Sequence, residues 1–374
     1  MDIYNQLGVK KYINAMATVT AHGGSIMPPE VLAAMIEASR SYININDLQK
    51  KAGAELARLT HNEAAMVSCG AAAGMVLAAA VAIAGDDHDK RMKLPDSAGM
   101  KNEILVSRAG RVGYDNAIRT GGGIIVEYGS AEQATEEALE AAITEKTAAV
   151  FYFTFAHSER MMKGQLPLDK VIKIAHKHGV PVVVDAAAQI PVKENLWLFT
   201  RDMGADVAIF SGGKGLRGPQ SSGLCVGKRA FIDQMIMHGC PNGGVGRPMK
   251  VGKEEIIGLL AAVKLYMDSD EDAVIAGYER DVQYVIDSFK GEKAVKVTRD
   301  FPSEAGQAMP RAKIAPVSLT GDAAAVAKWL YEADPAVLIA SDNEGLLLNP
   351  QTIEPGELDI VIAQIRKAIE AFRG

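Results

Sequence analysis

Cysteine is scarce in this chain, with only Cys69, Cys225 and Cys240 among 374 residues. A small, odd number of cysteines in a long chain excludes a small scaffold that is stapled by disulfides. Aromatic residues are also few, at 6%, whereas glycine is abundant, with 36 residues. This composition is typical of a closely packed α/β protein in which several loops expose their backbone.

The chain also has no excess of positive charge and no long apolar run, and we expect no leader segment. Its formal net charge of −6 argues against a protein that holds nucleic acid by bulk charge. The opening residues, MDIYNQLGVKKYIN, contain no basic segment followed by an apolar one. The apolar tract Ala71–Gly85 is mostly alanine and shorter than the about 20 residues that cross a membrane, so it predicts a buried helix. We therefore expect a globular cytoplasmic protein with neither a membrane nor a nucleic acid as partner.

Apolar, β-branched runs alternate with helical patterns through the middle of the chain. Continuous apolar runs indicate strands that are covered on both faces. Their alternation with helices predicts an α/β fold with a mostly parallel seven-stranded sheet flanked by helices. The expected strands are Ala64–Ser68, Ile104–Ser107, Gly123–Tyr128, Ala148–Phe155, Val180–Ala186, Val207–Ser211 and Ser222–Val226. The expected helices between them are Ala71–Ala84, Ala131–Ile143 and Leu168–His178.

The two ends of the chain show a different pattern. A long helical pattern runs from Lys253 to about Lys290, and short strands and two helices follow it. We expect a smaller α+β domain there. The predicted organisation is an N-terminal segment, residues 1–45, that packs with the small domain, a large α/β domain over residues 46–250, and a long helix with the small domain over residues 251–374.

The stretch Gly213–Gly218 matches the G-x-G-x-x-G pattern of dinucleotide-binding folds. In those folds a helix begins within the glycines, so that its N-terminus meets the pyrophosphate. Here Pro219 follows and then the strand Ser222–Val226, which leaves no room for a helix. The pattern therefore does not indicate a dinucleotide site.

The same stretch carries a lysine, Lys214, among glycines at the end of an apolar strand. Glycines let a planar group approach the backbone, and a partly buried lysine can act as an amine nucleophile. Asp185 ends another apolar strand 29 residues earlier. The carboxyl ends of parallel strands face one crevice, so the two groups are expected to meet. Pyridoxal phosphate (PLP) needs both, a lysine that binds it and an acid at its ring nitrogen. A surface lysine and a helix N-cap aspartate are the alternatives.

A third part of such a site lies between the strand Ala64–Ser68 and the alanine-rich helix. Ser68, Cys69, Gly70 and Ala71 form a turn of small residues that would expose backbone N–H groups at a helix N-terminus. That arrangement binds phosphate. Ser211, three residues before Lys214, could add a hydroxyl.

Together these features resemble the fold-type I, aspartate-aminotransferase-like PLP enzymes, and within them the family of selenocysteine synthase and D-glucosaminate-6-phosphate ammonia-lyase. The resemblance extends from about residue 10 to the C-terminus. It rests on Tyr12–Ala15, Ala64–Val67, Val106–Arg108, Phe210–Lys214 and Gly218–Gln220. It implies that Lys214 is the Schiff-base lysine, Asp185 the pyridinium partner and residues 68–72 the phosphate turn. Selenium-transferring members carry an additional N-terminal domain for tRNA, which we do not expect here.

Other polar residues are candidates for binding substrate or moving protons. His22 and His157 are candidate catalytic groups, and Gly246 is a candidate for contact with the cofactor. The candidate substrate-binding residues are Arg111, Arg119, Arg247 and Lys250. Solvated surface charges and a loop histidine without a special role are the alternatives. The histidines have no metal-ligand spacing, so we expect no metal.

The resulting hypothesis is a PLP-dependent lyase. It would perform α,β-elimination on a hydroxy amino acid, such as an amino sugar acid phosphate like D-glucosaminate 6-phosphate, and release a 2-keto acid and ammonia. A selenium or sulfur transferase, an aminotransferase or a racemase would use the same residues. A PLP-fold partner subunit without activity is the alternative that is not an enzyme. Sites of this fold type are completed between subunits, so a homodimer or higher homo-oligomer is expected.

Overall fold

The computed structural model describes residues 2–156 and 158–373. Its internal contacts group residues 27–269 into one compact unit and residues 1–26 with 270–374 into another. We call these the large unit and the small unit. The division into segments 1–45, 46–250 and 251–374 stays a prediction.

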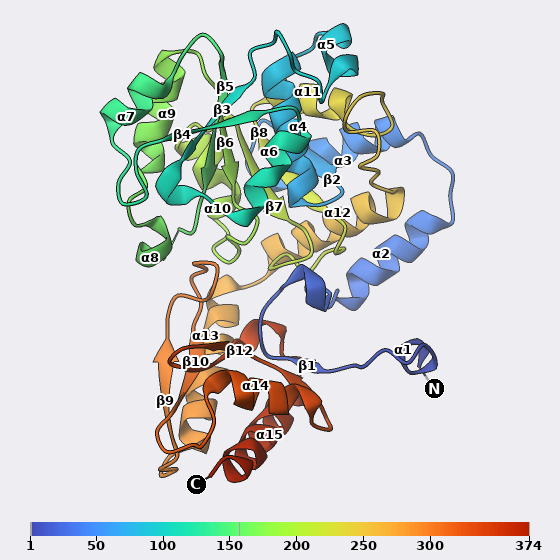
Figure 1. Ribbon diagram of the computed structural model, residues 1–374. Helices are drawn as coiled ribbons and strands as arrows, with labels where there is room; N and C mark the ends of the chain where they lie inside the picture. The colour runs from blue at the N-terminus through green and yellow to red at the C-terminus, as the bar shows by residue number, and fades with distance from the viewer. Residues whose placement is uncertain (1, 157, 374) are drawn as a thin grey trace. The chain divides into compact units, whose positions relative to one another are not determined.

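A seven-stranded sheet forms the centre of the large unit (Figure 1). Its strand order is β2-β8-β7-β6-β5-β3-β4, with β8 antiparallel to both neighbours and every other pair parallel. The expected fold class is thereby confirmed. The strands are β2 (Ala64–Ser68), β3 (Glu103–Ser107), β4 (Ile124–Tyr128), β5 (Thr147–Phe153), β6 (Val182–Asp185), β7 (Val207–Ser211) and β8 (Gly223–Gly227).

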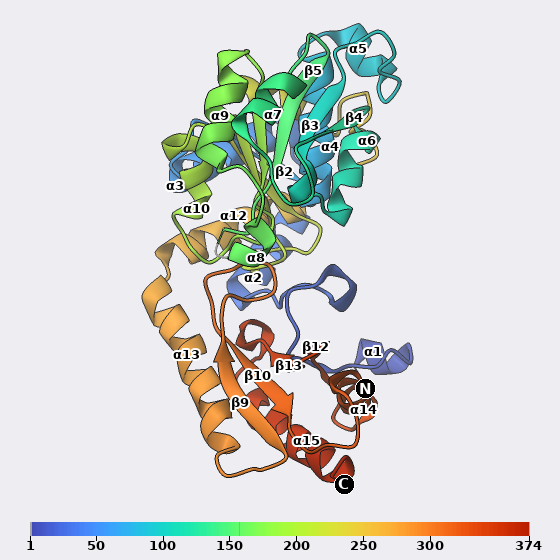
Figure 2. The same ribbon diagram turned by 60° about the vertical axis from the view of Figure 1, so that its left-hand side comes forward.

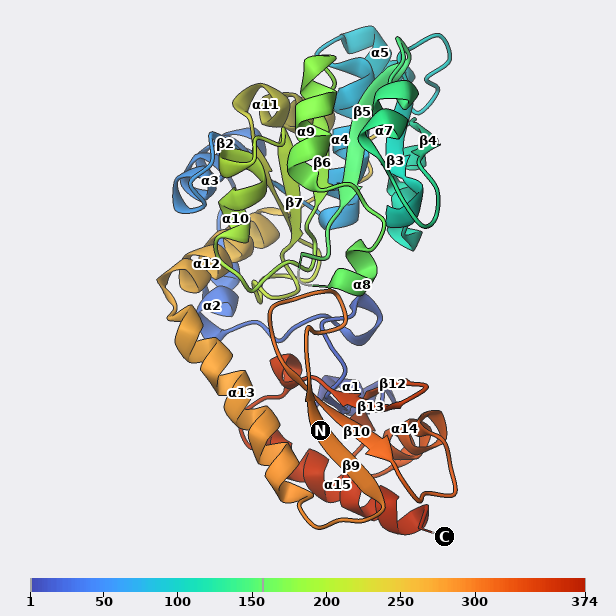
Figure 3. The same ribbon diagram turned by 90° about the vertical axis from the view of Figure 1, so that its left-hand side faces the viewer.

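Helices cover both faces of this sheet (Figures 2 and 3). A hydrophobic core lies on each face. One face packs against α4 (Ala71–Ala84), α6 (Asn116–Thr120) and α11 (Arg229–His238). The other packs against α3 (Ile45–Leu59), α7 (Glu136–Ala142), α9 (Leu168–Lys177), α10 (Asn195–Trp197) and α12 (Lys253–Asp268). Every residue of β2, β5, β6 and β8 is buried, because each of these strands is covered on both sides. The remaining α-helices of the large unit are α2 (Pro29–Ser39), α5 (His88–Lys93) and α8 (Glu159–Met162).

Helix ends differ from the sequence prediction where a side chain caps the backbone. The helix expected over Ala131–Ile143 begins only at Glu136, because the Thr135 side chain accepts a hydrogen bond from Ala138 N–H. The continuous pattern expected from Lys253 to Lys290 is two helices, α12 and α13 (Glu271–Ser288). The Asp270 side chain accepts from Ala273 N–H and starts the second helix. The break falls where the large unit ends.

The small unit has an antiparallel sheet of order β12-β13-β10-β9. Figure 2 shows α13 running alongside this sheet. The strands are β9 (Val295–Asp300), β10 (Arg311–Pro316), β12 (Ala340–Asp342) and β13 (Gly345–Leu348), and the other helices are α1 (Ile3–Gln6), α14 (Ala323–Glu332) and α15 (Glu357–Ala371). The N-terminal strand β1 (Ile13–Asn14) pairs with β11 (Val337–Leu338) in this unit. Within the described ranges, no helix has both the length and the apolarity needed to cross a bilayer.

Candidate active site

The carboxyl ends of β2, β6 and β7 bring three predicted site residues to one edge of the sheet. Gly223 of β8 pairs with both Ser68 and Ser211, and Asp185 pairs with Ile209, two residues before Ser211. Ile209 belongs to the core under α4. Register partners and alternate residues of a strand share a face, so Ser68, Ser211 and Asp185 all lie on the face that α4 covers.

The turn between β2 and α4 has the form of an anion site. Gly70 is the N-cap of α4, with φ of 131°, and, apart from its chain neighbours, no described residue has an atom within 4 Å of the position that a Cβ would take there. Ser68 Oγ donates a hydrogen bond of 2.8 Å to Gly70 O, which closes the turn. A Cβ on Gly223 would lie 2.5 Å from the Gly70 carbonyl carbon, so only glycine lets the turn cross β8. The positive end of the α4 dipole therefore faces an open space that can accept a phosphate.

Cys69 in this turn is not activated as a nucleophile. Burial raises the pKa of its thiol, so the thiol stays protonated at neutral pH. Cys225, which lies under the turn with its Sγ 3.8 Å from Ser68 Oγ, is fully buried, and its pKa is raised to about 12. All three cysteines are free thiols.

Asp185 is a buried carboxylate at the end of β6, with 9% of its surface exposed. Its Oδ1 accepts a hydrogen bond of 3.0 Å from Ala187 N–H. Burial raises the pKa of the carboxyl, and the Ala187 N–H and the positive charge of Lys214 act in the opposite direction. No helix begins until Asn195, so the N-cap alternative for Asp185 is wrong. A buried carboxylate of this kind is stabilised in its charged form by a protonated ring nitrogen.

Lys214 lies in a tight loop, residues 212–219, that follows β7. Gly218 N–H donates to Gly212 O over 2.7 Å and closes the loop. A Cβ on Gly212 would lie 2.0 Å from Ser222 Oγ, and one on Gly215 would lie 2.6 Å from Ile190 O. The glycines around Lys214 are therefore required by close packing, and the half-buried lysine projects from a well-defined backbone. No helix follows the glycines, as expected from Pro219.

The turn at Ser68–Ala71, the Asp185 carboxylate and Lys214 all belong to the large unit, and together they fit PLP. The open space at Gly70 accepts a phosphate, the buried Asp185 needs a cationic partner, and Lys214 is close enough to act on its pKa.

Comparison with known proteins agrees with this geometry. Residues 12–277 match the family described as SelA: L-seryl-tRNA selenium transferase, which is more than half of the chain. The chain belongs to the SelA family. The resemblance inferred from the sequence is thereby confirmed.

Members and solved structures with different activities are similar to this SelA-family chain. A D-glucosaminate-6-phosphate ammonia lyase from Salmonella typhimurium is 34% identical over 99% of this chain and 98% of that protein. An L-seryl-tRNA(Sec) selenium transferase from Nitratidesulfovibrio vulgaris is 24% identical over 96% of this chain and 82% of that protein. A solved D-glucosaminate-6-phosphate ammonia-lyase matches 100% of this chain and 99% of that chain, with a TM-score of 0.86 and 33% identity. A serine palmitoyltransferase from S. paucimobilis with bound PLP shares the fold at 12% identity, with a TM-score of 0.60, over 97% of this chain and 89% of that chain.

Two of the predicted substrate residues of this SelA-family chain are held by carboxylates. Arg111 forms ion pairs with Asp115 and Glu127. Arg119 Nη1 lies 3.6 Å from Asp115 Oδ1. Asp115 is buried, so the two arginines balance its charge. Their role in binding substrate stays a prediction.

The other predicted basic residues lie in the loop after α11. Arg247 and Lys250 are exposed, and Arg247 Nη1 donates to Cys240 Sγ over 3.6 Å. Gly246 packs on α4, where a Cβ would lie 2.5 Å from Leu77 Cδ2. This loop is therefore anchored to the helix that begins at the phosphate turn, with its two cations facing solvent.

The structure describes only one of the two candidate histidines. His22 belongs to the small unit, where its Nδ1 lies 3.0 Å from Tyr12 Oη and its ring packs edge-on to that tyrosine. His157 lies outside the described residues. Among the residues that are described, no three His, Cys, Asp or Glu side chains form a group that could hold a metal.

Sequence reasoning missed the segment that follows Asp185. Gln189, with 1% of its surface exposed, accepts a hydrogen bond of 2.9 Å from Ala156 N–H through Oε1. Its backbone O accepts from Asn195 Nδ2 over 2.8 Å. A glutamine within an apolar stretch is the signal that could have marked it as a residue that holds the loops beside β6.

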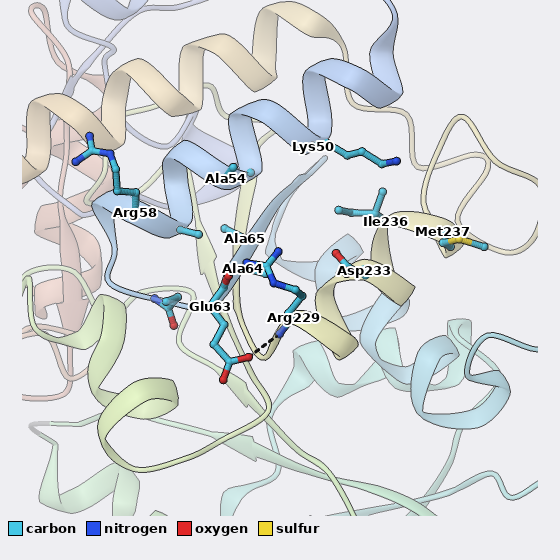
Figure 4. A pocket seen from close by; sticks show the side chains of 13 residues that line it. Lys50, Ala54, Arg58, Glu63, Ala64, Ala65, Arg229, Asp233, Ile236 and Met237 are labelled. Atoms are coloured by element: carbon cyan, nitrogen blue, oxygen red, sulfur yellow. Dashed lines mark hydrogen bonds between the residues drawn. The ribbon is translucent and has the colours of Figure 1, made fainter.

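A surface hollow of about 600 Å³ lies away from these residues, between α3 and α11 at the outer side of β2 (Figure 4). Its walls carry Lys50 and Arg58 on α3 and Arg229 and Asp233 on α11. Glu63 Oε2 accepts the Arg229 N–H over 3.1 Å and so caps the start of α11. The hollow contains none of the predicted site residues.

Proposed function

We propose that this chain is a PLP-dependent lyase. Its substrate is a hydroxy amino acid of the amino sugar acid phosphate class, such as D-glucosaminate 6-phosphate, and its products are a 2-keto acid and ammonia. The observation that carries the proposal is the combination of 34% identity to an ammonia lyase over 99% of the chain with Lys214, Asp185 and the phosphate turn in one unit. Identity to the selenium transferases is lower, at 23–25%.

Each part of the site has one role toward the cofactor. The turn at Ser68–Ala71 and the α4 N-terminus bind its phosphate, with Ser211 beside them. The Asp185 carboxylate holds a proton on the ring nitrogen. Lys214 Nζ holds the cofactor in place before substrate arrives. The bound cofactor supplies an electron sink for the carbanion that forms at the substrate Cα.

Lys214 then acts as the base. Its Nζ would take the proton from the substrate Cα. The β-hydroxyl leaves as water once an acid protonates it, and His22, His157 and Lys214 itself are the candidates. A water molecule hydrolyses the resulting unsaturated amine to the 2-keto acid and ammonia. Arg247 and Lys250 would bind the anionic tail of the substrate, and Gly246 would let the loop approach the cofactor, which is supported by their place in the loop that packs on α4.

The proposal includes a homodimer or larger homo-oligomer in the cytoplasm. Exposed apolar side chains on and after α2, namely Leu32, Ile36 and Tyr42, support an interface between copies. Three free thiols support a reducing compartment.

The test is a substrate panel with and without PLP. Hydroxy amino acids and amino sugar acids, each with and without a phosphate, are scored by release of ammonia and keto acid. We expect turnover only with PLP, preference for the phosphorylated substrates, and trapping of PLP on Lys214 by borohydride, with Lys214→Ala as the control. Failure to bind PLP would overturn the proposal, and equal turnover of serine would contradict the anionic tail. An inactive partner subunit would bind PLP without turnover, and a transferase or racemase would release no ammonia.

A further inference from the structure

The segment that follows Asp185 lies beneath the lysine loop. Ala187 N–H donates to Asp185 Oδ1, and Ala187 O accepts from Ser211 N–H over 3.2 Å. Ile190 fills the space under Gly215, the residue after Lys214, with its O at 2.6 Å from a Cβ built there. The segment therefore supports the carboxylate and the lysine at the same time.

Helix α12 supports the same loop from another side. Leu259 Cδ1 would lie 2.8 Å from a Cβ on Gly212 and 3.4 Å from one on Gly218. Gly258 is itself in contact with Pro219, whose Cγ would lie 2.7 Å from a Cβ built there. The loop that carries Lys214 is thus packed against both α12 and the segment at Ile190. The packing at its glycines is so close that a larger side chain there would collide with one of these two supports.

Lys193 joins these two supports. Its Nζ donates to Met267 O, in the last turn of α12, over 3.0 Å and to the O of Ser269, the C-cap of that helix. The same ammonium lies 5.8 Å from the centre of the Tyr266 ring. A cation at a helix C-terminus pairs with carbonyls that have no partner within the helix and with the negative end of the dipole. These contacts join residues 74 and 76 positions apart in the sequence.

Three links form what we call the ring: the loop that carries Lys214 packs against α12, carbonyls at the C-terminal end of α12 accept from Lys193 Nζ, and the chain from Lys193 back to Ile190, three residues earlier, returns to the loop. We propose that Lys193 is a positioning residue that fixes the backbone from which Lys214 projects. The effect on catalysis rests on the proposed function, whereas the effect on the backbone does not. Lys193 acts at the C-terminal end of α12, on the Met267 and Ser269 carbonyls.

Lys193→Met tests the ring, because it keeps the apolar stem and removes the three donors. Backbone hydrogen exchange in residues 212–219 of the cofactor-free protein should become about tenfold faster, because local opening costs less once one support is released. Lys193→Arg keeps a cation and should restore exchange to within about threefold of wild type. Lys170→Met is the matched control, since Lys170 is an exposed lysine of the large unit that pairs with Glu136.

The loaded enzyme gives the second measurement. In Lys193→Met, the release of bound PLP should be about tenfold faster and kcat about tenfold lower, with KM little changed, because a displaced Lys214 loses alignment with the substrate Cα. Should Lys193→Met fail to fold, Lys193→Gln, which keeps one donating group, is expected to show intermediate exchange.

Two outcomes would overturn the inference. Faster exchange confined to the last turn of α12, with residues 212–219 unchanged, would show that Lys193 caps the helix and does nothing for the loop. Unchanged PLP release and kcat in Lys193→Met would show that the ring has no effect on Lys214. The exchange experiment needs neither cofactor nor substrate. If the protein binds no PLP, the proposed function is refuted, and hydrogen exchange in residues 212–219 still tests the role of Lys193.

Discussion

Two buried aspartates lie at opposite edges of the same sheet, and each has 9% of its surface exposed. Asp206 precedes β7 at the amino edge. Its Oδ1 lies 2.7 Å from Lys228 Nζ, and its Oδ2 accepts Val182 N–H over 2.7 Å and lies 2.9 Å from His176 Nε2. Asp185 ends β6 at the carboxyl edge, where its Oδ1 accepts the Ala187 N–H and its pKa is raised by burial.

The difference shows that burial alone does not mark a catalytic carboxylate. Asp206 has partners from the protein on both oxygens, so its charge is balanced within the fold. Asp185 is buried to the same extent, but burial still disfavours its charged form. A cationic ring nitrogen would remove that penalty, and this is the property expected of a cofactor partner.

Asp185→Asn should have the largest effect on activity. The amide keeps the shape and still accepts the Ala187 N–H, but it cannot hold a proton on the ring nitrogen. We expect kcat to fall by a factor of about 10² or more, in the range of other lost proton-holding groups. Steady-state ammonia release measures it, with PLP occupancy checked by absorbance. Activity within tenfold of wild type would show that Asp185 is not the ring-nitrogen partner.

Asp206→Ala should have the largest effect on stability. Removal of this carboxylate takes the partner from Lys228 and His176, which are partly exposed, and leaves the buried Val182 N–H unsatisfied, which costs about 1–3 kcal/mol. Urea denaturation measures the loss. The folded variant should keep wild-type kcat per bound PLP. A loss of kcat in the folded variant would contradict the assignment of Asp206 to the fold and of Asp185 to the cofactor.

Gly223→Ala should weaken the phosphate turn. The added methyl would lie 2.5 Å from the Gly70 carbonyl carbon and 2.6 Å from Ser68 Oγ, so the turn must shift. Overpacking of this kind costs about 1–3 kcal/mol. PLP titration should show weaker binding than for Gly291→Ala, a control at a position with open space and a positive φ in the small unit. Equal PLP affinity for the two variants would place the phosphate elsewhere.

The pH dependence of the cofactor-free protein provides the smallest and most specific test. The Asp185 pKa is raised in the folded state above its ordinary value of 3.8, so ionisation of this group opposes folding. The unfolded chain loses this proton first, and stability falls as pH rises from about 4 through the raised folded pKa. The Asp185→Asn variant has no proton to lose at this position. The difference between its free energy of unfolding and that of the wild type should therefore grow in favour of the variant over that pH range and then stay constant. An advantage that is constant between pH 4 and 7 would contradict the shift.

Much of the large unit follows from local patterns. The seven apolar runs predicted the seven strands with ends within two residues, and α4 has the predicted bounds Ala71–Ala84. The helix break at Asp270 was missed because a capping aspartate looks like any polar residue on a helix surface. Asp185 and Lys214 could be singled out because polar residues at the ends of apolar strands are costly unless they are used.

By itself, the sequence determined the layers of the fold and the chemical groups available at the carboxyl edge, because periodicity and strand-end polarity are local properties. Only the tertiary structure decided which buried aspartate is balanced by the protein, and which carbonyls at the end of α12 Lys193 binds. The partners of Asp206 and Lys193 lie 22 to 76 residues away along the chain, so no local pattern records them. Contacts over such separations form only when packing of the whole unit brings the segments together.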